Sequence, residues 1–270
     1  VDGSWVKWKP QNYDGSTGGL TTLREGLRKS MNLISVRMVQ QDIAPSEQVK
    51  RTAQRMGITT DIRAVDALAL GTSEVFPLEI VSAYAAFANQ GVYSKPFPIT
   101  RVEDRYGNVI KEFYPERKEV LSEETAYLMT SLMQTVMDRG TGGSARWKYK
   151  FNRPAAGKTG TTQGWSDAWF VGFTPQIAAG CWFGVDDFRV PLGPGQDGSI
   201  SALPAWARFM KGAHDTLNFP IQKFEKPSGI HDIEICSVTK KAPVPACPVE
   251  KEIFKVGTEP IQKCKVHRTQ

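Results

Sequence analysis

The chain has 270 residues, of which 40% are hydrophobic and 23% are charged. This composition supports a folded core and excludes a disordered chain, a collagen-like repeat and a disulfide miniprotein. The 34 lysines and arginines exceed the 28 acidic residues by six, but this moderate excess is spread along the chain and does not indicate a nucleic-acid partner.

The first helices are predicted from capping signals. Thr22 with Glu25 three residues later forms a capping box, so we expect a helix from there to about Lys29. A second helix is expected after Ser46, with apolar residues on one face and an end at Gly57, which can adopt the left-handed cap conformation.

The next segment predicts a helix, a hairpin and another helix. Pro77 opens a helix that is apolar nearly all round until Gly91, and we therefore expect it to be central. Alternating runs at 99–103 and 109–113 flank a turn sequence and predict a β-hairpin. Ser122, followed by two glutamates, predicts the N-cap of a long helix.

From Pro154 onward the pattern is typical of strands. Three runs, 155–161, 167–173 and 177–185, predict a sheet, and the short connection between the last two makes them adjacent and antiparallel. A last helix is expected over 204–212.

Membrane and secretion signals are not visible in the sequence. The longest uncharged stretch, 168–185, is interrupted by glycines and by Thr174-Pro175, so each piece is too short to cross a bilayer as a helix. The chain opens at Val1 without a charged start and apolar run, so we expect no signal peptide and interpret it as a piece of a longer protein.

Residues 213–270 are rich in proline and lysine and show little periodicity, so we expect an irregular appendage held by cysteines. Cys236, Cys247 and Cys264 lie there, which favours an oxidising compartment; reduced thiols in a cytosolic protein are the alternative. Spacing does not fix the pairing. A Cys236–Cys247 disulfide is the most plausible bond because nearby prolines favour turns, and Cys181 is expected to stay reduced.

No metal site or cofactor is predicted. His214, His231 and His267 all lie toward the C-terminus, too few and too dispersed for a zinc site or a serine triad, and we expect each on the surface. Asp186-Asp187 follows a strand and more plausibly terminates it than forms an acid–base pair.

Gly157-Lys158-Thr159 is the first candidate for chemistry. A phosphate-binding loop is disfavoured because Asn152 stands where that motif needs glycine, and because a β-rich run follows where a helix is required. A polar edge strand with a solvated lysine is the simplest alternative. We favour a strand over 158–162 that lines an active-site cleft, where Lys158 and hydroxyls meet an anion and Gly160 allows close approach of a substrate backbone.

A second element, Ser30-Met31-Asn32, follows the first predicted helix and by itself is typical of a helix cap. Together, this serine-x-asparagine and the lysine-threonine-glycine at 158–160 resemble two of the three motifs of the active-site-serine, penicillin-recognising enzymes. Residues 156–162, 167–175 and 78–91 also resemble the transpeptidase domain of class A penicillin-binding proteins. The resemblance covers roughly residues 10–212.

The resemblance implies an α+β fold in which an antiparallel sheet is flanked by helices, as in penicillin-binding transpeptidases and serine β-lactamases. Residues 1–212 would form an N-terminally incomplete transpeptidase domain, and 213–270 a cysteine-containing tail. The implied reaction is acyl transfer from a D-alanyl-D-alanine stem peptide onto serine and then onto an amine of a neighbouring strand. β-Lactams would be covalent inhibitors of the intact protein.

The resemblance also assigns roles to residues. Ser30 would relay a proton to the leaving amine, Asn32 would hold the substrate amide, and Lys158 would supply positive potential for the substrate carboxylate. The Thr161 amide would form half of the oxyanion hole. The implied substrate-binding set is Thr159, Gly160, Thr161 and Thr162.

The nucleophile is expected outside the chain. In the family, a serine-x-x-lysine motif precedes serine-x-asparagine by several tens of residues, whereas only 29 residues precede Ser30. Ser237-Val238-Thr239-Lys240 fits the pattern but lies in the tail on the wrong side of Lys158, and we interpret it as coincidence. A serine nucleophile needs a nearby base, so we expect this chain alone to be inactive.

The intact parent is expected to be a bifunctional glycosyltransferase and D,D-transpeptidase in the bacterial cell envelope, held at the outer face of the cytoplasmic membrane by an anchor outside this chain. Its partners would be peptidoglycan stem peptides, not nucleic acid. A D,D-carboxypeptidase or β-lactamase relative is one alternative, although no water-activating motif is legible. A non-catalytic peptidoglycan- or partner-binding remnant is the other.

Overall fold

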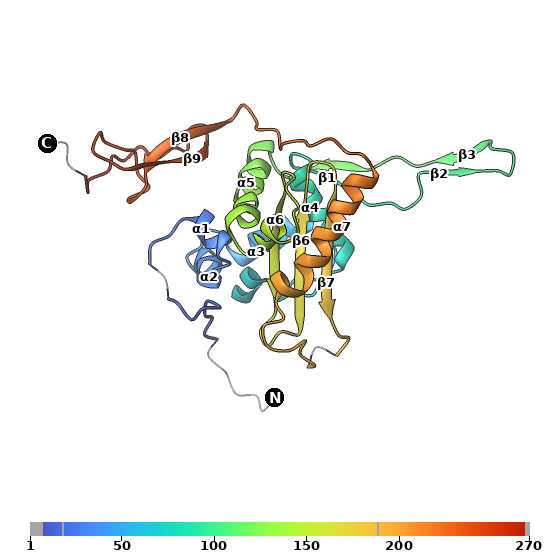
Figure 1. The fold of residues 1–270 in the computed structure, drawn as a ribbon, viewed down its shortest axis with the longest axis horizontal. Coiled ribbons are helices and arrows are strands. Elements are labelled where there is room, and N and C mark those ends of the chain that lie inside the picture. The colour runs from blue at the N-terminus through green and yellow to red at the C-terminus, as the bar shows by residue number, and fades with distance from the viewer. Residues whose placement is uncertain (1–7, 18, 188, 268–270) are drawn as a thin grey trace.

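The computed structural model describes residues 8–17, 19–187 and 189–267 (Figure 1). Its helices are α1 (Leu23–Arg28), α2 (Asn32–Gln40), α3 (Ser46–Arg55), the 3-10 helix η1 (Asp66–Leu70), α4 (Pro77–Ala88), α5 (Glu123–Arg139), α6 (Ser144–Trp147), the π-helix η2 (Gly198–Ala202) and α7 (Leu203–Thr216). Its strands are β1 (Val92–Ser94), β2 (Arg101–Glu103), β3 (Val109–Glu112), β4 (Arg117–Glu119), β5 (Ala156–Thr161), β6 (Asp167–Phe173), β7 (Ala178–Gly184), β8 (Ile230–Cys236) and β9 (Val249–Lys255).

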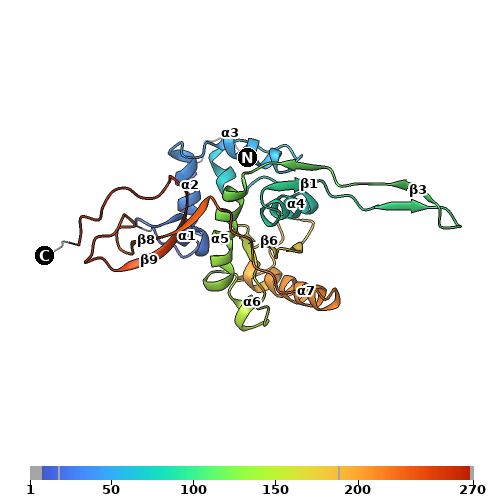
Figure 2. The same cartoon turned by 90° about the horizontal axis from the view of Figure 1, so that it is seen from above.

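The centre of the molecule is the antiparallel sheet β5-β6-β7, with helices on both faces (Figure 2). Successive side chains of β6 alternate between the faces. Phe170 packs on Trp206 of α7, with ring centroids 4.8 Å apart, whereas Phe173 stacks on Phe87 of α4 at 6.4 Å. The predicted α+β architecture, an antiparallel sheet flanked by helices, is confirmed.

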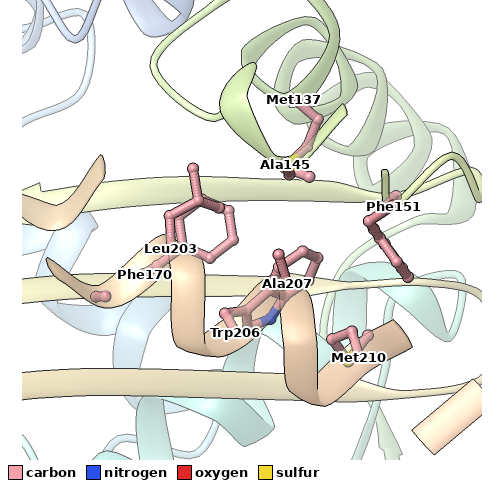
Figure 3. Packing of buried hydrophobic residues seen from close by; sticks show 10 residues of the cluster. Met137, Ala145, Phe151, Phe170, Leu203, Trp206, Ala207 and Met210 are labelled. Atoms are coloured by element: carbon pink, nitrogen blue, oxygen red, sulfur yellow. The ribbon is translucent and has the colours of Figure 1, made fainter. Parts of the chain in front are cut away.

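The face under α7 holds the largest core cluster (Figure 3). Trp206 is completely buried there, and its indole N–H donates to the carbonyls of Gly172 and Ala179 on two neighbouring strands. Its ring also meets Phe151 edge-on at 5.4 Å. The apolar ring and its polar N–H are therefore both satisfied, which fixes the helix on the sheet.

The opposite face is covered by α4 and α5, as the nearly uniform apolar composition of α4 predicts. Gly91, in the turn between α4 and β1, has φ +90°, and a Cβ there would lie 2.2 Å from the carbonyl oxygen of Leu121. Only glycine accepts both the conformation and the contact. Ser122 caps α5 as predicted, because its side chain accepts from the Thr125 amide.

The predicted hairpin at 99–113 forms as β2 and β3, and it projects away from the body of the molecule (Figures 1 and 2). Every residue of both strands is exposed. Asp104 organises the turn, since one of its carboxylate oxygens accepts from the Tyr106 and Asn108 amides.

Two sequence predictions are wrong in this part of the structure. The tail is not irregular, because β8 and β9 pair antiparallel from Ile230 opposite Lys255 to Cys236 opposite Val249. Likewise, His214 is not a surface residue: α7 continues to Thr216, and the imidazole is completely buried between the Thr174 hydroxyl and the Met210 carbonyl.

The tail hairpin packs on the helices at the end of the molecule opposite the projecting hairpin (Figure 1). Arg24 of α1 donates from Nε to Glu252 of β9 at 2.7 Å and from Nη1 to the Ser131 carbonyl of α5. Lys255 pairs with Glu124 of α5 at 3.3 Å. One arginine thus joins three elements.

Among the described residues, no helix combines the length and the apolar composition needed to cross a membrane.

Trp206→Ala is expected to lower the free energy of unfolding by about 3–5 kcal/mol, because it leaves a large cavity and frees two carbonyls. Phe209→Ala, on the same helix but at a side chain that is 57% exposed, is the matched control and should change it by less than about 1 kcal/mol. Denaturant titration of both variants compares them. Equal losses would show that Trp206 does not anchor the helix.

Candidate active site

Lys158 is the charged centre of the candidate site. It lies on β5 opposite Val171, on the face that α4 covers, and it borders the same cavity as Tyr84. Its ammonium donates to Ser30 Oγ at 2.8 Å, to the Thr159 carbonyl at 2.9 Å and to Thr159 Oγ1 at 3.3 Å. The structure therefore brings together two candidate residues that are 128 positions apart in the sequence.

Lys158 is a buried ammonium with a lowered pKa. Burial lowers the pKa of its ammonium from 10.5 to about 8. Its hydrogen-bond partners are a hydroxyl and atoms of Thr159, all neutral, and no carboxylate of the described residues pairs with it. A desolvated cation without a counter-ion strongly attracts an anionic ligand.

The backbone presents Ser30 to this lysine through an unusual conformation. Ser30 follows α1 with φ +55°, in the left-handed region that costs a non-glycine residue about 1–2 kcal/mol. The turn is held because the Met31 amide donates to the Gly26 carbonyl at 2.8 Å. Such strain is found at functional sites, where the surrounding structure maintains it.

The serine-x-asparagine segment does more than cap α1, because Asn32 is the first residue of α2, a helix that the sequence analysis missed. Asn32 Nδ2 donates to the Gln11 carbonyl at 2.9 Å, and among the described residues no hydrogen bond joins it to Ser30 or Lys158. The structure thus places Asn32 two residues from Ser30 but with its amide turned toward the preceding segment.

Asn12 is a positioning residue that sequence reasoning also missed. It is buried, and its Oδ1 accepts from the Leu33 amide at 3.0 Å, which satisfies a free amide at the start of α2. Its Nδ2 donates to the Ser16 carbonyl at 2.8 Å. No local pattern in the sequence indicates a cap supplied from 21 positions away.

The threonines after Lys158 have different surroundings. Thr159 Oγ1 lies 2.8 Å from Thr141 Oγ1, just past the end of α5. Thr161 is exposed, and its hydroxyl accepts from the Gly198 amide at 3.1 Å, so its own proton remains available for a ligand. Thr162 instead closes the turn before β6, accepting from the Asp167 amide at 2.8 Å.

The glycine of the motif is favoured by close packing within the sheet. A Cβ at Gly160 would lie 3.1 Å from the Cβ of Trp169, its partner on β6. Gly198 is tighter still, because a Cβ there would approach the Trp169 carbonyl oxygen to 2.2 Å. These two glycines let η2 lie directly against the end of β5, beside Thr161.

An apolar cavity of about 250 Å³ lies next to the site. Among the described residues that line it, Lys158 alone is charged, and the others come from α1, α3, α4, α5 and the loop after α3. They are Leu27, Ala53, Met56, Ile58, Ile80, Ala83, Tyr84, Phe87, Met129 and Met133.

The serine-x-x-lysine match at 237–240 does not join this site. Ser237 Oγ donates to the Pro248 carbonyl, and Lys240 pairs with Glu250 at 2.6 Å, so that lysine is not a base for that serine. A second match, Ser4-Trp5-Val6-Lys7, precedes Ser30 and was overlooked. It lies outside the described residues and 26 positions before Ser30, closer than the family spacing.

Comparison with known families accounts for most of the chain. Residues 1–186 match the family described as "Penicillin binding protein transpeptidase domain", and residues 226–269 match "Penicillin-binding protein 1A, C-terminal domain". Penicillin-binding protein 1A of Aquifex aeolicus is 37% identical over 257 residues, which is 95% of this chain and 34% of that protein. Penicillin-binding protein 2D of Bacillus subtilis is 32% identical, over 98% of this chain and 38% of that protein.

Solved structures show the same fold. The crystal structure of penicillin-binding protein 1A from Haemophilus influenzae superposes with a TM-score of 0.88 at 28% identity, covering 98% of this chain and 44% of that one. PonA1 of Mycobacterium tuberculosis in complex with penicillin V gives 0.67 at 24% identity, covering 81% and 62%. The chain spans about a third of the length of the curated relatives it matches.

Lys158 is expected to titrate near pH 8, because its burial disfavours the charged form. Only the neutral amine reacts with acetic anhydride, so its acetylation rate should rise through pH 7 to 9 and then level off. Competitive labelling, mapped by peptide mass spectrometry with exposed lysines as internal comparison, measures this. A midpoint at the ordinary 10.5 would contradict the desolvated environment.

Proposed function

This chain belongs to the penicillin-binding protein transpeptidase family, and we propose that it forms the carboxylate-binding half of a D,D-transpeptidase active site within a longer protein. The observation that carries this proposal is the desolvated Lys158 ammonium, which hydrogen-bonds Ser30 and lacks a carboxylate partner among the described residues. The C-terminal carboxylate of a D-alanyl-D-alanine stem peptide is the anion that would complete it.

In the proposed reaction, a serine nucleophile gives its proton to the lysine of its serine-x-x-lysine motif and attacks the carbonyl of the penultimate D-alanine. The peptide bond breaks, the acyl group stays on the serine, and the terminal D-alanine leaves as an amine. That amine needs a proton, which the Ser30 hydroxyl delivers while it is replenished from Lys158, 2.8 Å away. An amine of a neighbouring stem peptide then attacks the ester and frees the serine.

The remaining residues would hold the substrate in line with that chemistry. The Thr161 hydroxyl, which accepts from Gly198 and keeps its own proton, would donate to the substrate carboxylate. The Thr161 amide would donate to the developing oxyanion. The Thr159 hydroxyl lies 3.3 Å from the Lys158 ammonium, and Asn32 would need to release Gln11 to bind the substrate amide. Thr162 has the weakest support, since its hydroxyl is used by the turn.

The apolar cavity supports a place for the missing nucleophile. A serine attacking this substrate must lie close to both Ser30 and Lys158, and the cavity meets the site at Lys158. Its apolar lining fits an amphipathic or apolar helix that carries serine-x-x-lysine with the polar pair turned toward Lys158. We infer that a segment of the parent protein outside the described residues occupies it.

The parent protein is proposed to work in the bacterial cell envelope, with a transpeptidase domain that runs past the expected boundary at 212 to the end of α7 at Thr216 and a tail that follows it. A glycosyltransferase domain and a membrane anchor would come from other parts of that protein. No cofactor takes part in the proposed reaction. β-Lactams would acylate the same serine, because their carboxylate meets the same Lys158.

In the intact parent protein, Lys158→Ala should slow acylation by a penicillin at least about tenfold, equivalent to roughly 1.4 kcal/mol in the barrier. The physical reason is the loss of the buried ammonium that would face the carboxylate. Stopped-flow or gel-based acylation rates measure the effect. Lys111→Ala, on the exposed β2–β3 hairpin, is the matched control and should leave the rate unchanged. An unchanged rate in Lys158→Ala would favour a non-catalytic binding role.

The 270-residue polypeptide alone should not be labelled by a fluorescent penicillin, because neither of its two serine-x-x-lysine matches stands at the family's distance before Ser30. A polypeptide extended upstream through the family's nucleophile motif should be labelled. Mass mapping of the adduct decides the matter, since stoichiometric labelling of the short chain at Ser4, Ser30 or Ser237 would place the nucleophile inside it.

A further inference from the structure

Four potential metal ligands meet in the tail, far from Lys158 in the sequence. The Sγ atoms of Cys236, Cys247 and Cys264 and a ring nitrogen of His267 all lie within 4.8 Å of one another. His267 Nδ1 is 3.5 Å from Cys236 Sγ and 3.3 Å from Cys264 Sγ. Cys236 and Cys264 are buried, and all three cysteines are free thiols, so the expected Cys236–Cys247 disulfide is not present.

The backbone of the tail converges on this point. Cys236 ends β8, and a turn follows in which the Lys240 amide donates to the Cys236 carbonyl at 2.8 Å. An isolated parallel bridge joins Ala242 to Lys263, and the Cys264 amide donates to the Ala242 carbonyl at 2.8 Å. These contacts bring two ligands together from segments 28 positions apart.

We propose that Cys236, Cys247, Cys264 and His267 Nδ1 bind one zinc ion in a tetrahedral Cys3His site. With zinc bonds of about 2.3 Å to sulfur and 2.0–2.1 Å to nitrogen, a tetrahedron places sulfur and nitrogen about 3.6 Å apart. The two observed sulfur–nitrogen distances, 3.5 and 3.3 Å, are already close to that value. Four protein ligands leave no open position, which makes the site structural.

The surroundings of the sulfurs fit bound thiolates. The Thr239 amide donates to Cys236 Sγ at 3.4 Å, and the Val244 amide donates to Cys247 Sγ at 3.3 Å. Amide donors of this kind orient ligands and spread the negative charge of a metal centre. Three thiolates and one zinc ion carry a net charge of −1, and the flanking sequence is basic, with Lys240, Lys241, Lys263 and Lys265.

A metal would add to the contacts with α1 and α5 that hold this small unit. An isolated two-stranded hairpin is marginally stable, and segments of about 40 residues usually need a metal or disulfides. Apart from the cysteines themselves, the fully buried apolar residues of this hairpin are Ile230 and Ile235. A disulfide would use two thiols and leave one thiol and the imidazole without a role, whereas zinc uses all four groups.

The dispersed histidines alone predict no zinc site, but one histidine suffices when three cysteines join it. The spacing from Cys236 to Cys247 is too long for the usual paired-cysteine signal. The short spacing of Cys264-x-x-His267 is the one local pattern here that indicates a metal site.

The test uses the untagged 270-residue chain, stripped of metal by a chelator under a non-thiol reductant and then dialysed against zinc. Elemental analysis should find one zinc per chain, and cobalt should give the absorption of a tetrahedral cobalt thiolate. Cys181→Ser, which removes the one cysteine outside the cluster, is the matched control and should retain one equivalent. His267→Gln should weaken zinc binding more than about 100-fold, beyond the cost of an outer-shell change.

A second measurement does not depend on the variants folding. With zinc bound, Cys236, Cys247 and Cys264 of the wild-type chain should resist alkylation, while Cys181 should react at the same rate with and without zinc. Absence of zinc from chains whose tail thiols are reduced would overturn the proposal. So would a tail disulfide, found by mass mapping of protein isolated without reductant, that persists when zinc is in excess.

Discussion

The hydrogen bond from the Lys158 ammonium to the Ser30 hydroxyl is the contact on which the site depends, and it requires three elements to meet at one place. β5 supplies the lysine, the end of α1 supplies the serine, and the end of α5 closes the gap between them. Arg28 donates to the Arg139 carbonyl at 2.7 Å, and Thr141 meets Thr159 at 2.8 Å. Because the ammonium is desolvated and faces only neutral oxygens, it remains available for an anion.

The sheet and its helices could be predicted from the sequence because each signal was local. The Ser122 cap and the turn between 167–173 and 177–185 act within a few residues. The missed α2 shows the opposite case, because its cap is Asn12, far upstream, and its own composition is only weakly amphipathic. The tail hairpin was missed because its many charged and proline residues obscure the alternation, while its order depends on contacts with α1 and α5.

Some residues of the candidate site could likewise be predicted from local motifs, whereas the positions of others depend on long-range contacts. The sequence motifs predicted Lys158 and Ser30 as site residues. The 2.8 Å contact between them is visible only in the structure, because the two residues are 128 positions apart. The positions of Asn32, which bonds Gln11, and Thr162, which closes a turn, depend on long-range packing. The tail adds a structural connection, because β9 holds Arg24 on α1, the helix that leads into Ser30. A closed metal centre would therefore steady the hairpin that braces this helix.

A double-mutant cycle on Ser30 and Lys158 in the intact parent protein tests most directly whether the two act as one unit. Acylation by a penicillin would be measured for Ser30→Ala, for Lys158→Ala and for the pair. If Lys158 works through the Ser30 hydroxyl, the double variant should be little slower than the slower single variant. Rate losses that simply multiply would show that the residues act independently and would contradict the proposed relay.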